Sequence, residues 1–165
     1  MLKPDRLRAA LVEAAPEYGR DPDRLAIYID QGRVATRLSP GNASFEYRYR
    51  LRATLLDFTG HPDIVMVALV KWLSVEQPDL LQRHETGSEA IGFEADVLAG
   101  GAIDLDISLQ LTEAVVLRPR EGGGHDLVHL EEPALAAPVY EGFEGLDDSV
   151  ALGAIWLGGE QILPG

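Results

Sequence analysis

The clearest pattern in the sequence is an alternation of apolar and polar residues between Ser44 and Leu55. One set of positions is apolar or aromatic: Phe45, Tyr47, Tyr49, Leu51, Ala53 and Leu55. The intervening positions are Glu46, Arg48, Arg50, Arg52 and Thr54. Because successive side chains of a strand point to opposite faces, the pattern predicts a long strand that is buried on one face and charged on the other.

A very apolar helix is predicted directly after this strand. Pro62 suits the first helical position, Asp63 suits the positive end of the helix dipole, and Pro78 ends the helix after Gln77, with His61 or Gly60 as the N-cap. The residues between are almost all apolar and include Met66, Val70 and Trp72. A surface helix needs only one apolar stripe, so a second apolar surface must cover this helix, from the same chain or from a neighbour.

The first third of the chain predicts one helix and one hairpin. Apolar residues at helical spacing between Pro4 and Ala15 indicate an amphipathic helix that ends at Pro16. Residues 24–30 and 33–38 each alternate with a period of two. Gln31 and Gly32 lie between them, so we expect a β-hairpin with its turn there.

After the apolar helix the alternation returns. Residues 91–97 and 103–111 read as two strands joined by a turn at Gly100 and Gly101. The alternation fails at Glu113, where a bulge or the end of the strand is expected. Residues 115–117 continue the strand in one interpretation, with residues 126–130 as its partner across the triple glycine at 122–124.

These elements predict an α+β (mixed α/β) fold. We expect a small, mostly antiparallel or mixed sheet of four to six strands packed by two main helices, with an extended C-terminal arm that ends in a hairpin. The predicted organisation is a core domain over residues 1–130, an acidic linker rich in Pro and Gly over 131–148, and a docking segment over 149–165. Within that segment, residues 154–163 have a two-residue hairpin pattern that contains Trp156.

Charge and composition restrict the possible functions. The net charge is -13, and it is concentrated in the second half: residues 1–83 hold 12 basic and 11 acidic residues, whereas residues 84–165 hold 2 and 16. An acidic protein is a poor general binder of nucleic acid. The chain has no cysteine, which excludes disulfides and thiolate metal sites, and no stretch approaches the roughly 20 apolar residues of a membrane span.

No catalytic, metal or cofactor site is expected, because the common phosphate-binding, esterase and zinc motifs do not occur. His125 and His129 are a weak metal candidate, since the context favours a strand on which they lie about 13 Å apart. His61 could be a general base between Asp57 and Asp63, but its role as the N-cap of the helix is the simpler interpretation. Asp104 and Asp106 fit a solvated strand face better than a catalytic pair.

The arginines of the long strand have two interpretations. Basic residues interleaved with Tyr47 and Tyr49 resemble a nucleic-acid-binding strand, but the two sets lie on opposite faces. A better partner for the arginines is an acidic row, within one sheet or across a subunit boundary. The candidate subunit or partner interface therefore consists of Arg48, Arg50, Arg52, Glu94, Asp96, Asp104 and Asp106, with Met66, Val70, Trp72 and Trp156.

Several short segments, in this order, resemble the phage tail completion protein R family of contractile-tailed temperate phages and related tail-like particles. They are Met1-Leu2-Lys3-Pro4-Asp5, Ser44-Phe45-Glu46-Tyr47-Arg48-Tyr49, Asp57-Phe58-Thr59-Gly60, Trp72-Leu73 with Gln77-Pro78, and Leu111-Thr112-Glu113. The resemblance runs from Met1 to about Val116. Beyond Glu131 the likeness is one of kind, a Pro-rich linker followed by a short terminal segment.

The resemblance implies a structural protein of the virion and not an enzyme. It implies a homohexameric ring at the head-proximal end of the tail, assembled in the host cytoplasm, that stops tube or sheath polymerisation and prepares head-tail joining. The implied partners are other copies of the chain, the tail tube or sheath protein, and a head-side connector or neck protein; no cofactor, membrane or sequence-specific nucleic acid is implied, although DNA would pass through the ring. The alternative is a protein that contacts DNA at the head-tail junction through Arg48, Arg50 and Arg52.

Overall fold

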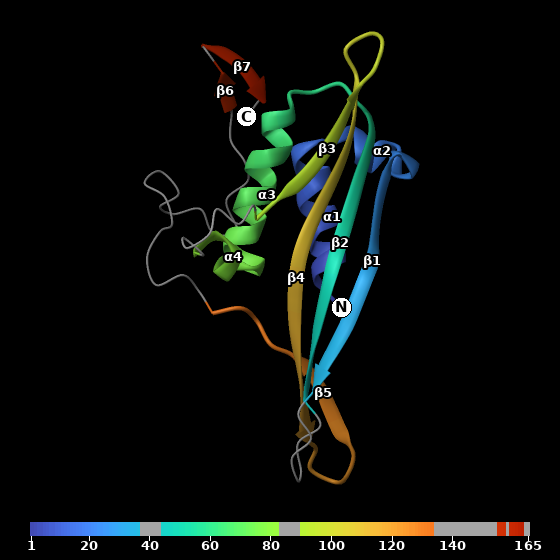
Figure 1. Cartoon of the computed structure of the whole chain (residues 1–165). Coiled ribbons are helices and arrows are strands. Elements are labelled where there is room, and N and C mark those ends of the chain that lie inside the picture. Colours follow the sequence, from blue (N-terminus) through green and yellow to red (C-terminus); the bar gives the residue numbers. More distant parts are fainter. Residues whose placement is uncertain (37–43, 83–89, 134–154, 158, 164–165) are drawn as a thin grey trace.

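A computed structural model describes residues 1–36, 44–82, 90–133, 155–157 and 159–163 of the chain (Figure 1). Its helical elements are α1 (Lys3–Ala14), α2 (Glu17–Arg20), the 3₁₀ turn η1 (Pro22–Arg24), α3 (Pro62–Glu76) and α4 (Pro78–Gln82). Its strands are β1 (Leu25–Thr36), β2 (Phe45–Phe58), β3 (Gly92–Val97), β4 (Ile103–Pro119), β5 (His125–His129), β6 (Ile155–Leu157) and β7 (Glu160–Leu163). None of the helices in these ranges is long and apolar enough to cross a membrane.

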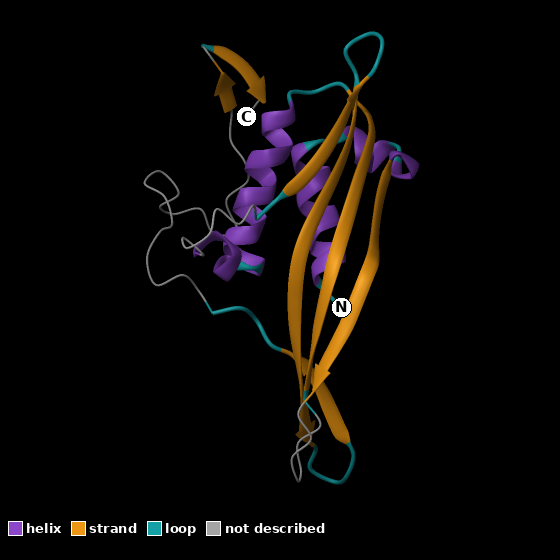
Figure 2. Ribbon diagram, in the orientation of Figure 1, coloured by secondary structure: helices purple, strands orange, loops and turns teal. Residues whose placement is uncertain are grey.

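A long antiparallel sheet forms one layer of the molecule. Its strand order is β1-β2-β4-β3, and β5 pairs with the end of β4 that β3 does not reach. Helices α1 and α3 cover one face of the sheet, and none of the described elements covers the other face, which we call the uncovered face (Figure 2). The predicted α+β class with a small antiparallel sheet and two main helices is confirmed.

The core lies between the sheet and these two helices. It is centred on Leu51 and Leu55 of β2 and on Leu105 and Ile107 of β4, which are all almost fully buried. The paired residues of β2 and β4 share a face, as the register Leu51↔Leu109, Ala53↔Ile107 and Leu55↔Leu105 shows. The alternation in the sequence therefore identified the buried face of β2 correctly.

Helix α3 is covered by its own chain along most of its length. Val65, Leu69 and Leu73 are fully buried against the sheet and α1. The N-cap is His61, whose Nδ1 accepts a hydrogen bond from the backbone N–H of Asp63 at 3.3 Å. The prediction of a capped helix from Pro62 is confirmed, and much of its second apolar surface comes from within the chain.

The hairpin expected at Gln31 and Gly32 does not exist. Both residues lie inside β1, which pairs with β2 from Leu25↔Leu55 to Thr36↔Phe45. The register shifts between Ile29 and Gln31, so Asp30 is the extra residue of a β-bulge. The prediction was wrong because the extra residue of a bulge interrupts the alternation in the same way as a short turn.

The expected break at Glu113 is also wrong. Strand β4 continues through Glu113, which pairs with Tyr47 and is 4% exposed on the core face of the sheet. By contrast, the glycine turns at 100–101 and 122–124 are confirmed by positive φ angles, and β5 pairs with β4 as predicted. The terminal hairpin is confirmed as β6 and β7, while residues 134–154 of the expected linker and arm lie outside the described residues.

Candidate functional site

The three arginines of β2 are bound to carboxylates of their own chain. Arg48 Nε lies 2.6 Å from Glu46 Oε2, Arg50 Nε lies 2.8 Å from Asp30 Oδ1, and Arg52 Nε lies 3.1 Å from Asp106 Oδ1. Hydrogen bonds from Arg50 hold the pKa of Asp30 below its ordinary value. One of the predicted pairings, between Arg52 and the acidic row, is therefore present within one sheet.

The four acidic residues of the predicted row share the uncovered face of the sheet. Glu94 is the register partner of Asp106, and Asp96 is the register partner of Asp104. Asp104 Oδ1 accepts a hydrogen bond from the backbone N–H of Asp57 at 2.8 Å. With Asp30 and Glu46, six carboxylates accompany the three arginines of β2, and Arg33 of β1 lies opposite Arg48 on the same face. The face is net acidic, and the three arginines of β2 are already engaged, which argues against DNA phosphate as their ligand.

The apolar residues of the predicted interface lie in different surroundings. Trp72 is 7% exposed and belongs to the main core, whereas Met66 is partly buried against it. Val70 is partly buried on α3. Trp156 lies in β6, in register with Gln161 of β7. An interface role for these residues stays a prediction.

The two outer strands of the sheet carry exposed apolar side chains. On β3, Phe93 is 61% exposed and Val97 is 79% exposed, although they share the core face with their partners Ile107 and Ile103. On β1, Val34 is 58% exposed. Among the described residues no strand pairs with the outer edge of either β1 or β3. We name these surfaces the β3 edge (Phe93, Glu94, Asp96 and Val97) and the β1 edge (Tyr28, Arg33 and Val34).

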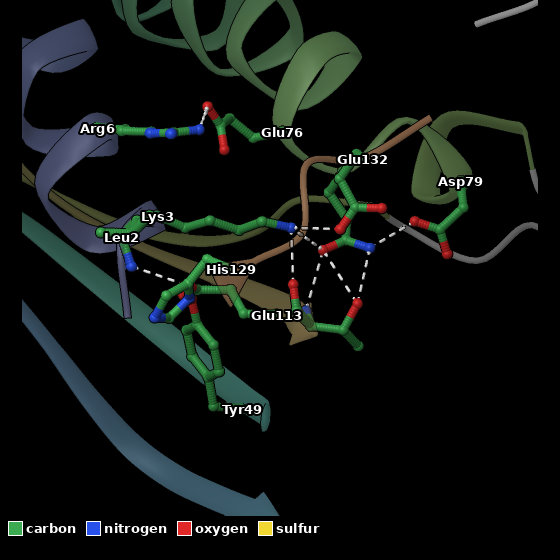
Figure 3. Close-up of polar contacts among 11 residues, drawn as sticks. Leu2, Lys3, Arg6, Tyr49, Glu76, Asp79, Glu113, His129 and Glu132 are labelled. Atoms are coloured by element: carbon green, nitrogen blue, oxygen red, sulfur yellow. Dashed lines mark hydrogen bonds and ion pairs between the residues drawn. The ribbon is translucent and has the colours of Figure 1, made fainter. Parts of the chain in front are cut away.

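A buried polar cluster closes the gap on β4 between β3 and β5 (Figure 3). The Lys3 ammonium donates to Gln77 Oε1 at 2.8 Å, to the carbonyl oxygen of Thr112 at 2.7 Å and to Glu132 Oε1 at 2.8 Å. The Gln77 side chain in turn accepts a hydrogen bond from the backbone N–H of Thr112 at 3.0 Å. Lys3 and Gln77 therefore satisfy the backbone groups of Thr112 in place of a neighbouring strand.

Glu113 is the second centre of this cluster. It accepts hydrogen bonds from the backbone N–H of Leu2, at 2.7 Å, and from the hydroxyl of Tyr49, and its Oε2 lies 3.4 Å from His129 Nδ1 (Figure 3). Burial, and then the hydrogen bond to Glu113, raise the pKa of Tyr49. The cluster ties the start of α1 to β2, β4 and β5, so its role is to position these elements. In the sequence, the sign of this cluster was an acidic residue, Glu113, at a position where the alternation of β4 places side chains on the core face.

Comparison with known proteins agrees with the resemblance noted above. The P2 phage tail completion protein R (GpR) family matches residues 1–133. The chain belongs to this family. The curated Tail completion protein R of Escherichia phage P2 is 37% identical over 139 residues, which cover 84% of this chain and 88% of that protein. No solved structure matches the chain.

Membership of the tail completion protein R family places the chain among the structural proteins of a phage tail. The family match covers the sheet, both main helices and the buried polar cluster, and it ends before β6 and β7. His125 and His129 lie at the two ends of β5, and the described residues contain no group of three or more side chains suited to a metal ion.

Proposed function

We propose that this tail completion protein closes into a ring of about six subunits at the head-proximal end of the tail. There the ring stops polymerisation of the tube or sheath and presents its other axial face to a head-side connector or neck protein. Beside the family membership, one observation carries this proposal: the outer strands β1 and β3 differ in character, and no other described strand pairs with their outer edges.

A closed ring is built from head-to-tail contacts, in which each subunit offers two different and complementary surfaces. The β3 edge carries exposed Phe93 and Val97 with the carboxylates of Glu94 and Asp96. The β1 edge carries exposed Val34 and the cation of Arg33. Opposite charge and shared apolar character make the two edges complementary.

The apolar part of such a contact supplies most of its free energy. Burying one large apolar side chain contributes about 1.5–3 kcal/mol, whereas an exposed ion pair contributes about 0–1 kcal/mol. The charges would therefore select the β1 edge of a neighbour and reject a second β3 edge. The sequence left open whether Arg48, Arg50 and Arg52 pair within one sheet or across a subunit boundary. They already have carboxylate partners in their own chain, so the proposed contact uses the β3 edge and the β1 edge instead.

The test combines the mass of the purified protein with electron microscopy of particles. We expect native mass spectrometry at micromolar concentration to give a closed oligomer of about six subunits. Particles assembled without this protein are expected to have tails of uncontrolled length that fail to join heads. A monomer that leaves tails uncapped, or normal joined tails in its absence, contradicts the proposal.

A further inference from the structure

A second apolar cluster lies apart from the main core. It consists of Ala14, Ile64 and Ala68, which are 3–4% exposed, and we name it the docking cluster. It forms where the last residue of α1 meets the first turns of α3. Ile162 of β7 packs against it, and Figure 1 shows the β6–β7 hairpin beside this end of α3.

Apart from Ile162, the described side chains of the hairpin are exposed to solvent. Leu157 is 48% exposed, and Glu160 and Gln161 are exposed as well. A two-stranded hairpin is marginal in water without packing against something else. The packing of Ile162 on the docking cluster supplies such a contact.

The connection to the hairpin is long compared with the distance that it must span. Glu132 is bound by Lys3 at the start of α1, and the docking cluster lies at the other end of this 12-residue helix, about 18 Å away. The 22 residues between Glu132 and Ile155 reach up to about 70 Å when extended. The same hairpin can therefore reach the docking cluster of an adjacent subunit.

We propose that the β6–β7 hairpin is an exchanged arm, which docks through Ile162 on the docking cluster of the neighbouring subunit. This inference rests on the proposed ring, because a ring holds the neighbouring cluster within reach. Exchange of an identical element reuses the contact seen within one chain, so it has a low energetic cost. It also adds a second link to each subunit contact, which slows dissociation of the ring.

The absence of native cysteine allows a direct test by disulfide trapping. One chain carries Ala68→Cys and a second chain carries Ile162→Cys, and the two are co-expressed and mildly oxidised. A disulfide requires the two Cα atoms to lie within about 7 Å. The two chains carry tags of different size, so the non-reducing gel separates a disulfide between one chain of each kind, which reports exchange, from a disulfide between two copies of the same chain. Ala14→Cys replaces Ala68→Cys if the latter lowers the melting temperature.

The matched control pairs Ala68→Cys with Leu157→Cys, which places the thiol on the exposed strand of the same hairpin. We expect the linked pair with Ile162→Cys and its loss with Leu157→Cys. A single chain that carries both Ala68→Cys and Ile162→Cys is oxidised for comparison. If a disulfide closes only within this chain and the ring keeps its mass, the exchange is overturned and the ring proposal stands. Linked pairs without a ring support the exchange and reject the ring. No disulfide of either kind overturns the docking contact.

Discussion

Gln77 makes contacts that no other side chain of the polar cluster reproduces. It binds Lys3 and the backbone N–H of Thr112, and it is 2% exposed. The change Gln77→Leu leaves both donors without this acceptor, so we expect the free energy of unfolding to fall by about 1–3 kcal/mol. Urea unfolding followed by circular dichroism measures the change. Gln110→Leu, at an exposed position of β4, is the control, and an equal effect of the two changes contradicts the prediction.

Tyr18 gives the stability a dependence on alkaline pH. It is 1% exposed, its hydroxyl donates to the carbonyl oxygen of Leu56 at 3.2 Å, and burial raises its pKa from 10.0 to about 12. Between these values the unfolded chain has lost the proton and the folded chain still holds it. The contribution of Tyr18 to the free energy of unfolding is therefore fully present below pH 10. It falls as the pH rises toward 12, by at most about 1.4 kcal/mol per pH unit.

Tyr18→Phe is expected to reduce the slope of unfolding free energy against pH over this interval, and the slope that stays is expected from Tyr49, whose pKa burial also raises. Tyr28→Phe is the control, because Tyr28 is 46% exposed on β1. Measurement of urea unfolding at several pH values between 9 and 12 decides the point. A slope that stays the same in Tyr18→Phe would show that other groups control the alkaline transition.

Contacts between residues were predictable where strand pattern and charge agreed. Arg52 and Asp106 lie on polar faces of two predicted strands, so their pairing followed from alternation and opposite charge. The contacts of Lys3 with Gln77 and Glu132 were not predictable, because 74 and 129 residues separate the partners. They depend on where the ends of α1 and α3 meet β4, which local sequence does not determine.

At the scale of elements, α3 is the helix on which the core depends most. Trp72 is 7% exposed and contacts the core cluster, so Trp72→Ala is expected to lower the free energy of unfolding by about 3–5 kcal/mol. Thermal unfolding and native mass together test this change. Lys71→Ala, at the adjacent and partly exposed position, is the control. An unchanged melting temperature with unchanged oligomer size would refute the prediction.

Elements with one consistent period were predicted well, and those with an interruption were not. The alternation of β2 and the cap and proline signals of α3 each have one structural explanation. A single irregular position has several explanations. Asp30 is the extra residue of a bulge next to Gln31 and Gly32, where a turn was expected, and Glu113 is a buried acid where a bulge or a strand end was expected. Partners distant in sequence decide between these outcomes, which is why sequence pattern alone failed there.

At the scale of the whole molecule, the order of strands determines which surfaces are open. Alternation shows which side chains share a face, but it does not show which strands lie at the edges of the sheet. Residues 91–97 therefore read as an ordinary half-buried strand, whereas β3 is an edge strand whose Phe93 and Val97 stay exposed. Glu94 and Asp96 of the candidate interface are exposed, and their exposed apolar neighbours Phe93 and Val97 were not predicted; an interface role for any of them stays a prediction.

The β3 edge can be tested separately from the fold. Phe93→Lys places a charge at a position that is 61% exposed, so we expect little change in melting temperature. If Phe93 is buried between subunits, its loss removes about 1.5–3 kcal/mol per contact, which weakens association by about tenfold or more. Light scattering across a dilution series measures this.

Leu127→Lys provides the matched control for this experiment, because Leu127 is 62% exposed on β5, away from both proposed edges. It introduces the same charge at an equally exposed apolar position, so it accounts for general effects of charge on association. We expect the ring to dissociate at higher protein concentration in Phe93→Lys and to behave as the unsubstituted protein in Leu127→Lys. The same dissociation in both variants, or in neither, would exclude the β3 edge as a ring contact, because a specific contact responds to the position of the charge and not to its presence alone.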